Sequence, residues 1–440
     1  MSGAPDRDTI YRTGADADAL LPNMGRYRWY VLFVLALAQS CHALDRSVIG
    51  LVLEPVKREF GLSDQQAGLL AGFSYGVAFA IAAIPFGMVV DRFNRRNLLS
   101  IVLSIWSGFT LICGLANSYV ALLLARSAVG AAEAGGSPTG MSLMTDYFRP
   151  AERASAVGLW YASSGVGTLG AFMAGGFIAQ HYGWRAAFIA AGAPGLIIAL
   201  LVFLTVREPV RGGLDPVRAP IPEGETAPRL SLPARLLLIA RTPGLPHCMI
   251  GLVLVAVASS AIIAWLTAFL MRIHHLQLAT AGTVVAICIG LASSLGVALL
   301  GLFVDGLNRR RGFSAARSGL FAAGITAITA VLGAISFLAA STVVSIVFLI
   351  LMGVFIAAYN GPANGLIITI SDSRVRGLSV AVVQFWANLV GFGLGPLIVG
   401  TVTEGLGGGV MLRWGLVAIL AFYLWGSLHF LLAARRLMKR

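Results

Sequence analysis

The chain has 440 residues, a mean hydropathy of +0.84 and 12% charged residues, which is about half the charged fraction of a typical soluble protein. This composition excludes a soluble globular domain and predicts an all-α membrane protein. The net charge of +13 alone would suggest a nucleic-acid binder, but its distribution along the chain excludes that class.

Runs of about 20 apolar residues, long enough to cross a bilayer as helices, occur twelve times. The predicted spans are 28–53, 65–90, 96–117, 119–144, 153–180, 185–206, 244–271, 278–305, 315–338, 342–370, 376–402 and 410–434. A proline-rich polar gap separates the sixth span from the seventh and is typical of a linker. The predicted organisation is an N-terminal tail (1–27), a six-helix bundle (28–206), a linker (207–243), a second six-helix bundle (244–434) and a C-terminal tail (435–440).

Lysine and arginine are distributed unevenly between the two predicted sides of the membrane. With the N-terminus inside, 25 of the 32 lie on the cytoplasmic side, five on the opposite side and two within spans. Cytoplasmic loops of membrane proteins carry this excess of positive charge. Both termini are therefore expected to be cytoplasmic, and the basic excess reflects topology rather than a nucleic-acid partner.

A repeated loop indicates that the two halves are related. The segment GMVVDRFNRR (87–96) follows the second predicted span, and GLFVDGLNRR (301–310) follows the eighth, with six of ten positions identical. Both loops are on the cytoplasmic side. The halves are therefore predicted to be parallel repeats related by an axis along the membrane normal.

Three motifs carry a family resemblance. The loop at 87–96 resembles the signature loop of the major facilitator superfamily, Arg126-x-x-x-Gly130 is similar to another motif of that superfamily, and VREPVRG (206–212) resembles the element that closes its sixth helix. The resemblance implies the major facilitator fold, with twelve transmembrane helices that alternate between inward- and outward-facing states.

A narrower resemblance is to the spinster-like branch of that superfamily. It rests on the Asp-Arg pair in the first span and on two segments, EPVKREFGLSDQQAGLLAGFSYG (54–76) and EAGGSPTGMSLMTDYFRPAERASAVG (133–158). Members of that branch move sphingolipids or lysophospholipids, some together with protons. The resemblance implies a lipid-like cargo for this chain.

Four charged residues lie well inside predicted spans: Asp45, Arg46, Arg126 and Glu133. From a rise of about 1.5 Å per residue, Asp45 and Arg126 lie at similar depth and are expected to form a salt bridge, with Glu133 about 10 Å deeper. Glu133 or Asp45 is the expected carrier of a coupling proton, and Arg126 the partner of a carboxylate or an anionic substrate. His42, one turn before this pair, is expected to join the relay. The alternative is a static ion pair that orients two helices.

A second group of residues is expected to act as a gate at the cytoplasmic side. These residues are Gly87, Asp91, Arg92, Arg95, Arg96 and Asp305. A carboxylate at a helix end suits the positive N-terminus of a neighbouring helix. By the resemblance, Asp91 is expected to contact the helix that begins near Arg376.

The second half has neutral polarity inside its spans, and five residues are expected to line a cavity. They are Tyr359, Asn360, Asn364, Gln384 and Asn388. A charged wall opposite an apolar, amide-bearing wall favours an amphipathic cargo of the lysophospholipid or sphingolipid type. The alternative is a proton-coupled organic-anion or drug transporter of the same fold.

Other classes are disfavoured by what the sequence lacks. No cluster of His, Cys or acidic residues has the spacing of a metal site or a nucleophilic site, so neither an enzyme nor a cofactor is expected. A channel would require charge along a central axis, whereas charge here is confined to one half. The expected protein is a monomer in the cell membrane, the inner membrane if it is bacterial, with protons and membrane lipids as further partners.

Overall fold

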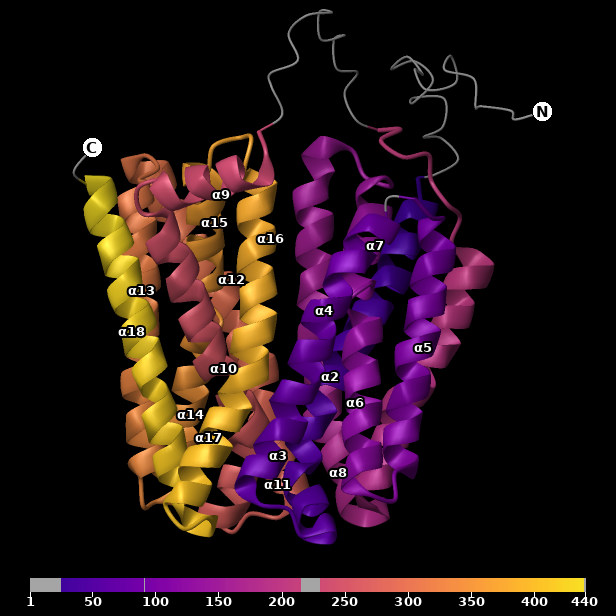
Figure 1. Ribbon diagram of the computed structural model, residues 1–440, viewed down its shortest axis with the longest axis vertical. Coiled ribbons are helices and arrows are strands. Elements are labelled where there is room, and N and C mark those ends of the chain that lie inside the picture. The colour runs from indigo at the N-terminus through magenta and orange to yellow at the C-terminus, as the bar shows by residue number, and fades with distance from the viewer. Residues whose placement is uncertain (1–24, 91, 215–229, 439–440) are drawn as a thin grey trace, which may run out of the picture.

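The computed structural model describes residues 25–90, 92–214 and 230–438, and within these ranges it contains helices and no strands (Figure 1). The helices of the first half are α2 (Tyr27–Phe60), α3 (Asp64–Gly68), η2 (Leu69–Phe73), α4 (Ser74–Val89), α5 (Arg95–Leu115), α6 (Tyr119–Glu133), α7 (Gly136–Thr145) and α8 (Pro150–Thr205). Those of the second half are α9 (Leu232–Arg241), α10 (Leu245–Ile273), α11 (Leu278–Val285), η3 (Ala286–Ala292), α12 (Ser293–Arg311), α13 (Ala315–Leu338), α14 (Thr342–Ile356), α15 (Asn360–Ile370), α16 (Arg376–Trp386), η4 (Ala387–Phe392), α17 (Gly393–Gly405), η5 (Gly409–Met411) and α18 (Leu412–Met438).

Helix boundaries follow from local sequence. Gly61 ends α2 in the left-handed conformation with φ of 61°, which glycine adopts without steric cost. Ser63 then caps α3, because its hydroxyl accepts the main-chain N–H of Gln66 while the Gln66 side chain accepts that of Ser63. Ser118 caps α6 in a similar way. These caps fix where the chain turns between membrane-sized helices.

Within the described residues, ten helical runs are long and apolar enough to cross a membrane, whereas the sequence predicted twelve spans. The difference has two local causes. The predicted fourth span is divided into α6 and α7, each too short to qualify alone, and the predicted fifth and sixth spans run together as α8.

Helix α8 is a hairpin rather than a straight rod. Gly183 interrupts it with φ of 84° and ψ of 163°. Before the break, the Trp160 indole donates to the Leu35 carbonyl (3.2 Å), and just after it the Trp184 indole donates to Glu59 (2.6 Å) at the other end of α2. Thr205, at the end of α8, is back beside the start of α2. The chain therefore reverses at Gly183.

The two halves lie side by side and share two backbone irregularities (Figure 1). Short π-helical segments occur at matching places, η2 in the second predicted span and η3 in the eighth. The predicted fourth and tenth spans are both broken, between α6 and α7 and between α14 and α15. At each break the helical bonds tighten, from Gly135 N–H to Ala132 O (3.3 Å) and from Ala358 N–H to Phe355 O (3.1 Å).

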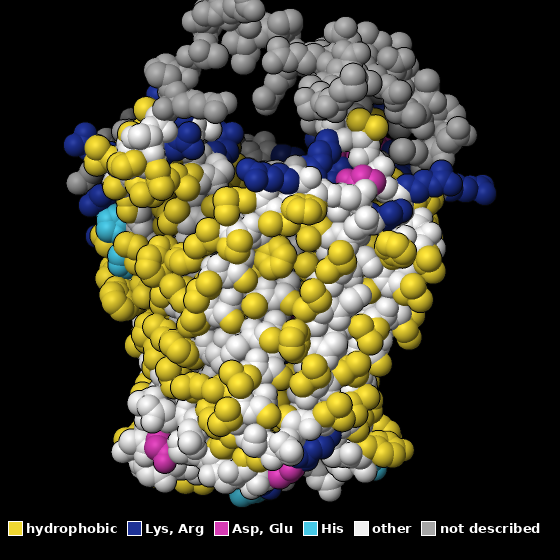
Figure 2. Space-filling view, turned by 45° about the vertical axis from the view of Figure 1, so that its right-hand side comes forward, with side chains coloured by type: hydrophobic (Ala, Val, Ile, Leu, Met, Phe, Trp, Pro, Cys, Tyr) yellow, Lys and Arg dark blue, Asp and Glu magenta, His cyan; other side chains and the backbone are white. Residues whose placement is uncertain are grey.

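The two ends of the molecule differ in charge. We call the end where α8 finishes and α9 begins the linker end, and the opposite end, which carries α3, the far end. Figure 2 shows lysine and arginine gathered at the linker end and hydrophobic side chains over the middle of the visible face. Exposed apolar residues such as Ile197 (70%) and Leu299 (62%) cover the flanks of both halves. This surface is that of a multi-pass membrane protein.

Gly130 provides a test of the packing between α4 and α6. A Cβ atom there would lie 2.5 Å from the Tyr75 carbonyl oxygen, so the two helices touch through a residue without a side chain. We expect Gly130→Val to destabilise the protein by about 1–3 kcal/mol, as overpacking does. Thermal melting of purified protein should report this loss. Gly108→Val is the control, because nothing lies within 4 Å of its added Cβ. Equal melting temperatures of the two variants would contradict the close contact between α4 and α6.

Candidate functional site

The intramembrane charges expected from the sequence gather between α2 and α6. Helix α2 carries His42, Asp45 and Arg46, and α6 carries Arg126 and Glu133 at its last residue. Asp45 and Glu133 are fully buried, and Arg126 is 1% exposed. We call these five residues the charged site.

Glu133 has two polar neighbours. The Tyr75 hydroxyl of α4 donates a hydrogen bond to Glu133 Oε2, and the His42 ring nitrogen Nε2 lies 3.3 Å from the same oxygen. The other carboxylate oxygen, Oε1, has no hydrogen-bond partner among the described residues. His42 thus places a ring nitrogen from a different helix beside the buried carboxylate.

The expected salt bridge between Asp45 and Arg126 is absent from the ion pairs of the described residues, and that expectation was wrong. Arg126 Nη1 donates instead to the main-chain carbonyl of Asp45 at 3.3 Å. Both Asp45 carboxylate oxygens are buried without a hydrogen-bond partner in the described part of the chain, and Thr110 and Trp106 are neutral side chains that face them. Arg126 does reach α2 at Asp45, but closeness of two residues does not fix which group of a residue faces the neighbour.

Tyr75 connects the charges on the two helices. The guanidinium carbons of Arg46 and Arg126 each lie 5.3 Å from the centre of the Tyr75 ring. The ring face attracts both cations, and the hydroxyl of the same ring contacts the Glu133 carboxylate. Tyr75 was not among the expected site residues, because a tyrosine in an apolar span gives no sequence signal of its own.

Arg46 is the member of the charged site that contacts the second half of the molecule. Its Nη2 donates to Asn388 Oδ1 of η4 at 3.3 Å, and its guanidinium carbon lies 3.5 Å from the centre of the Phe392 ring. Asn388 in turn donates to the Gln384 carbonyl. The site therefore contacts both halves midway between the two ends.

The remaining polar residues expected in the second half lie beside the break between α14 and α15 or on α16. Tyr359 is buried, Asn364 is half-buried, and Asn360 and Gln384 are exposed. The amides of Asn360 and Asn364 donate to the carbonyls of Ala357 (3.1 Å) and Asn360 (3.0 Å). Apart from Asn388, the described contacts do not bring these residues to the charged site.

The residues expected to form a gate lie at the linker end. Arg95 is buried and pairs with Asp146 (2.5 Å) and Glu208 (2.8 Å), so its ion pairs order the first half internally. The other expected gate residues are the half-buried Arg96 and the exposed Gly87, Arg92 and Asp305. Asp91 lies outside the described residues, and its contact with the start of α16 stays a prediction.

A network of charges at the far end joins the two halves, and sequence reasoning missed it. Arg272 of α10 pairs with Glu54 of α2 (Nε to Oε2, 2.7 Å) and with Asp64 of α3 (Nη1 to Oδ1, 2.8 Å). Lys57 pairs with the same Asp64 oxygen at 2.6 Å, and the Asp64 main-chain N–H donates to Glu404 of α17 at 2.7 Å. We call these five residues the far-end network.

The far-end network is largely removed from solvent. Asp64 is fully buried, and the side chains of Glu54 and Arg272 are each 7% exposed. A second link, from Gln180 of α8 to the main-chain N–H of Ala279 (2.8 Å), reinforces the same end. Three acidic residues just outside the predicted spans on this side, Glu54, Asp64 and Glu404, were the signal available in the sequence. Arg272, the partner of Glu54 and Asp64, lies more than 200 positions away and could not be identified from spacing.

Residues 35–396 match the family model described as Major Facilitator Superfamily. The fold is similar to the crystal structure of a bacterial homologue of the human lysosomal transporter Spinster in an inward-facing and unoccupied conformation, with a TM-score of 0.80, 27% identity, and coverage of 94% of this chain and 98% of that one. An MFS-type efflux pump of Mycolicibacterium smegmatis is 26% identical over 93% of this chain and 94% of its own length. Human protein spinster homolog 1 is 29% identical over 55% of this chain and 46% of that protein.

Removing Arg272, the cation that the second half contributes to the far-end network, should release the two halves at that end. Breaking a buried ion pair leaves an uncompensated charge and costs about 3–5 kcal/mol. We therefore expect Arg272→Met to lengthen the distance between spin labels at Gln65 and Leu406, which are both exposed at the far end. The four native cysteines are buried, so labels on introduced cysteines report this distance by electron paramagnetic resonance.

The matched control for this experiment is Arg185→Met. Arg185 pairs with Glu59 at the same end, but both residues belong to the first half. Its loss should leave the label distance unchanged. An Arg272→Met protein with the wild-type distance distribution would show that the network does not hold the halves together.

Proposed function

Because the chain belongs to the Major Facilitator Superfamily and resembles its spinster-like branch, we propose that it is a secondary active transporter for an amphipathic, lipid-like substrate. Members of this superfamily are membrane transporters and not enzymes, and the ten long apolar helices agree with a multi-pass membrane protein. The substrate is of the lysophospholipid or sphingolipid type, and its transport is coupled to protons. The protein works as a monomer.

The proposed topology has twelve crossings, six in each half, with both termini in the cytoplasm. The hairpin in α8 supports two crossings there, and α6 followed by α7 is long enough for one more. The 25-to-five division of lysine and arginine supports a cytoplasmic linker end. The far end is then extracellular.

The observation that carries the proposal is a pair of fully buried carboxylates beside two arginines, one of which reaches the second half. An isolated charge in the bilayer costs at least about 2.5–3.5 kcal/mol, so residues of this kind mark substrate and proton pathways. Glu133 takes up a proton at the oxygen that faces His42, and Asp45 is the second candidate carrier. Protonating either carboxylate removes a negative charge and so raises the net positive charge of the site that holds Arg46 and Arg126.

This net positive charge attracts the anionic head of the substrate. Arg46 suits this role because it is half-buried and already contacts Asn388 and Phe392 of the second half. The exposed polar residues of α15 and α16 offer neutral hydrogen-bonding groups for the rest of the head. Substrate binding and proton binding would thus change the same contact between the halves.

Alternating access then requires that the two ends open in turn. The far-end network and the Gln180 contact support a state that is closed at the extracellular side. Asp91 and its neighbours in the loop at 87–96 would close the cytoplasmic side in the opposite state, with Asp305 in the second repeat. The inward-facing conformation of the similar bacterial Spinster homologue supports the same assignment.

A second candidate is a proton-coupled drug or organic-anion transporter. The similarity to a mycobacterial efflux pump over nearly the whole chain favours it, because that relative is described as an efflux pump. The charged site would serve either substrate class. The two substrate classes differ in whether a ligand must carry an acyl chain in order to bind.

We expect Glu133→Gln and Asp45→Asn each to abolish proton-driven uptake of a lysophospholipid into proteoliposomes, because an amide cannot release a proton. Uptake under an imposed pH gradient, measured with radiolabelled lysophosphatidylglycerol, checks this. Glu59→Gln is the control, since Glu59 is an exposed carboxylate at the far end. Wild-type pH dependence in both site variants would rule out the charged site as the coupling site.

A thermal-shift panel separates the two substrate classes. Lysophospholipids with an anionic head should raise the melting temperature of the purified protein, since ligand at 100 times its Kd stabilises by about 2.7 kcal/mol. Arg46→Gln should remove the shift caused by lysophospholipids, and Arg185→Gln should leave it. If small organic anions shift the melting temperature and lysophospholipids do not, the drug or organic-anion transporter is the better description.

A further inference from the structure

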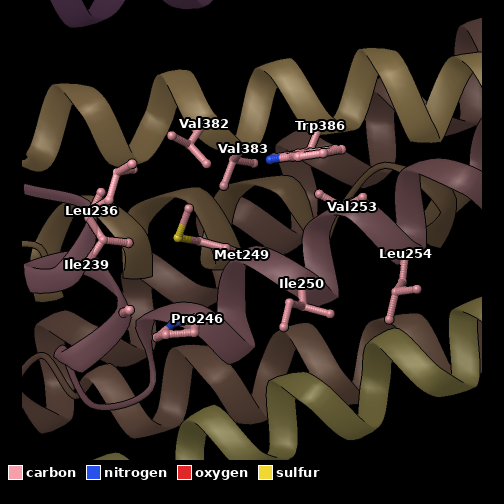
Figure 3. A pocket seen from close by; sticks show the side chains of 11 residues that line it. Leu236, Ile239, Pro246, Met249, Ile250, Val253, Leu254, Val382, Val383 and Trp386 are labelled. Carbon is pink, nitrogen blue, oxygen red and sulfur yellow. The ribbon is translucent and has the colours of Figure 1, made fainter. Parts of the chain in front are cut away.

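A groove separate from the charged site lies where α9 and α16 pack beside α10. Its volume is about 400 Å³, within the range of ligand pockets in proteins. Leu236 and Ile239 of α9 close one end, and Met249 and Val253 of α10 face Val383 and Trp386 of α16 (Figure 3). The lining is apolar throughout, so the groove suits a hydrocarbon chain and not a soluble polar molecule.

The groove lies on helices that cross the membrane. Both α10 and α16 belong to candidate spans, Leu245–Ile273 and Arg376–Gly405. Among the lining residues, Ile250 is 43% exposed and Trp386 is 47% exposed. An exposed apolar surface of this kind within a span contacts lipid, and the molecules that surround it in the cell are phospholipids.

Helix α9 has the composition of a helix that lies on a membrane surface. Its sequence LPARLLLIAR combines apolar residues with two arginines, Arg235 and Arg241. Ile239 is buried toward the groove, whereas Leu232 and Leu237 are 59% and 49% exposed. Leucines exposed beside arginines on one short helix are typical of the boundary between headgroups and acyl chains.

The helix that closes the apolar groove carries positive charge. Arg235 and Arg241 are the chain neighbours of the lining residues Leu236 and Ala240. Arg235 is half-buried and its Nε donates to the Leu230 carbonyl at 2.9 Å, whereas Arg241 is exposed. Arginine near a membrane surface attracts anionic headgroups and leaves neutral ones unaffected. This charge complementarity selects the headgroup, and the apolar lining selects the chain.

We propose that this groove is a binding site for a resident phospholipid with an anionic headgroup, one acyl chain lying between α10 and α16 and the phosphate beside the arginines of α9. The inference goes beyond the proposed function, because the lipid is a structural partner and not the cargo. Trp386 lies two residues before Asn388, which contacts Arg46. An occupied groove would hold α16 in the position that makes this contact.

Photocrosslinking tests the proposal on the full chain in phosphatidylcholine vesicles. The probe is phosphatidylglycerol with a diazirine in one acyl chain, and the labelled residues are found by peptide mass spectrometry. Label should concentrate on the segments around Met249 and Trp386, above the equally lipid-exposed segment that contains Ile197 and Leu200. The same diazirine on phosphatidylcholine should label the groove less.

Variants test whether the photolabelling comes from binding in the groove or from general contact with the surrounding lipid. Val253→Trp fills the groove and should remove its label, while Ile197→Trp on the exposed face of α8 should not. Arg241→Gln, at an exposed position that the fold does not require, should lower the preference for phosphatidylglycerol about fivefold, the equivalent of one headgroup contact. Equal labelling by both phospholipids in the wild type would overturn the proposal.

A competition experiment distinguishes a resident lipid from the transported substrate. Excess unlabelled lysophosphatidylglycerol should compete poorly at the groove if the site holds a diacyl phospholipid. Displacement of the label by this lysophospholipid, at the concentration that saturates transport, would assign the groove to the substrate and contradict the resident-lipid proposal.

Discussion

The cost of placing ionised side chains inside a bilayer is the constraint on which the rest of this structure depends. The protein meets it without tight carboxylate–guanidinium pairs in the charged site. Glu133 is held by Tyr75 and His42, Arg126 by a main-chain carbonyl, and Arg46 by an amide and a ring of the second half. Neither buried carboxylate is paired with a guanidinium group among the described residues. The arginines instead contact neutral groups.

The polar contacts between the halves lie at two depths. At the far end they are ionic and buried, through Arg272, Asp64 and Glu54. Midway, the charged site contributes one hydrogen bond and one stacked ring at Arg46. These polar contacts lie beside closely packed helices, since a Cβ atom at Gly76 of α4 would lie 2.7 Å from the Cα atom of Gly393 in α17. The Arg46 contact is the one that adjoins the buried carboxylates.

The sequence predicts the fold well because hydropathy, loop charge and the repeated loop are properties of neighbouring residues. It also predicts that Asp45 and Arg126 lie close together, since opposite charges in apolar spans favour pairing, and it places Glu133 about 10 Å deeper. It does not predict which atoms meet. Arg126 reaches a backbone carbonyl that no pattern distinguishes, and Tyr75 looks like any aromatic residue in a span. The Arg272 pairs join distant parts of the chain, so no spacing rule could identify them.

The matching breaks in the two halves have a consequence for how recognition is divided. At the break after Glu133 the first half adds charged side chains, whereas at the break before Asn360 the second half adds only Tyr359 and amides. Interrupted helices expose main-chain carbonyl and N–H dipoles, which transporters commonly use to hold ligands. Such dipoles keep their strength at every pH and survive every side-chain replacement. Mutational scanning would thus detect the side-chain contacts of both halves, such as the contact of Asn388 with Arg46, and miss those made by the main chain at the break in the second half.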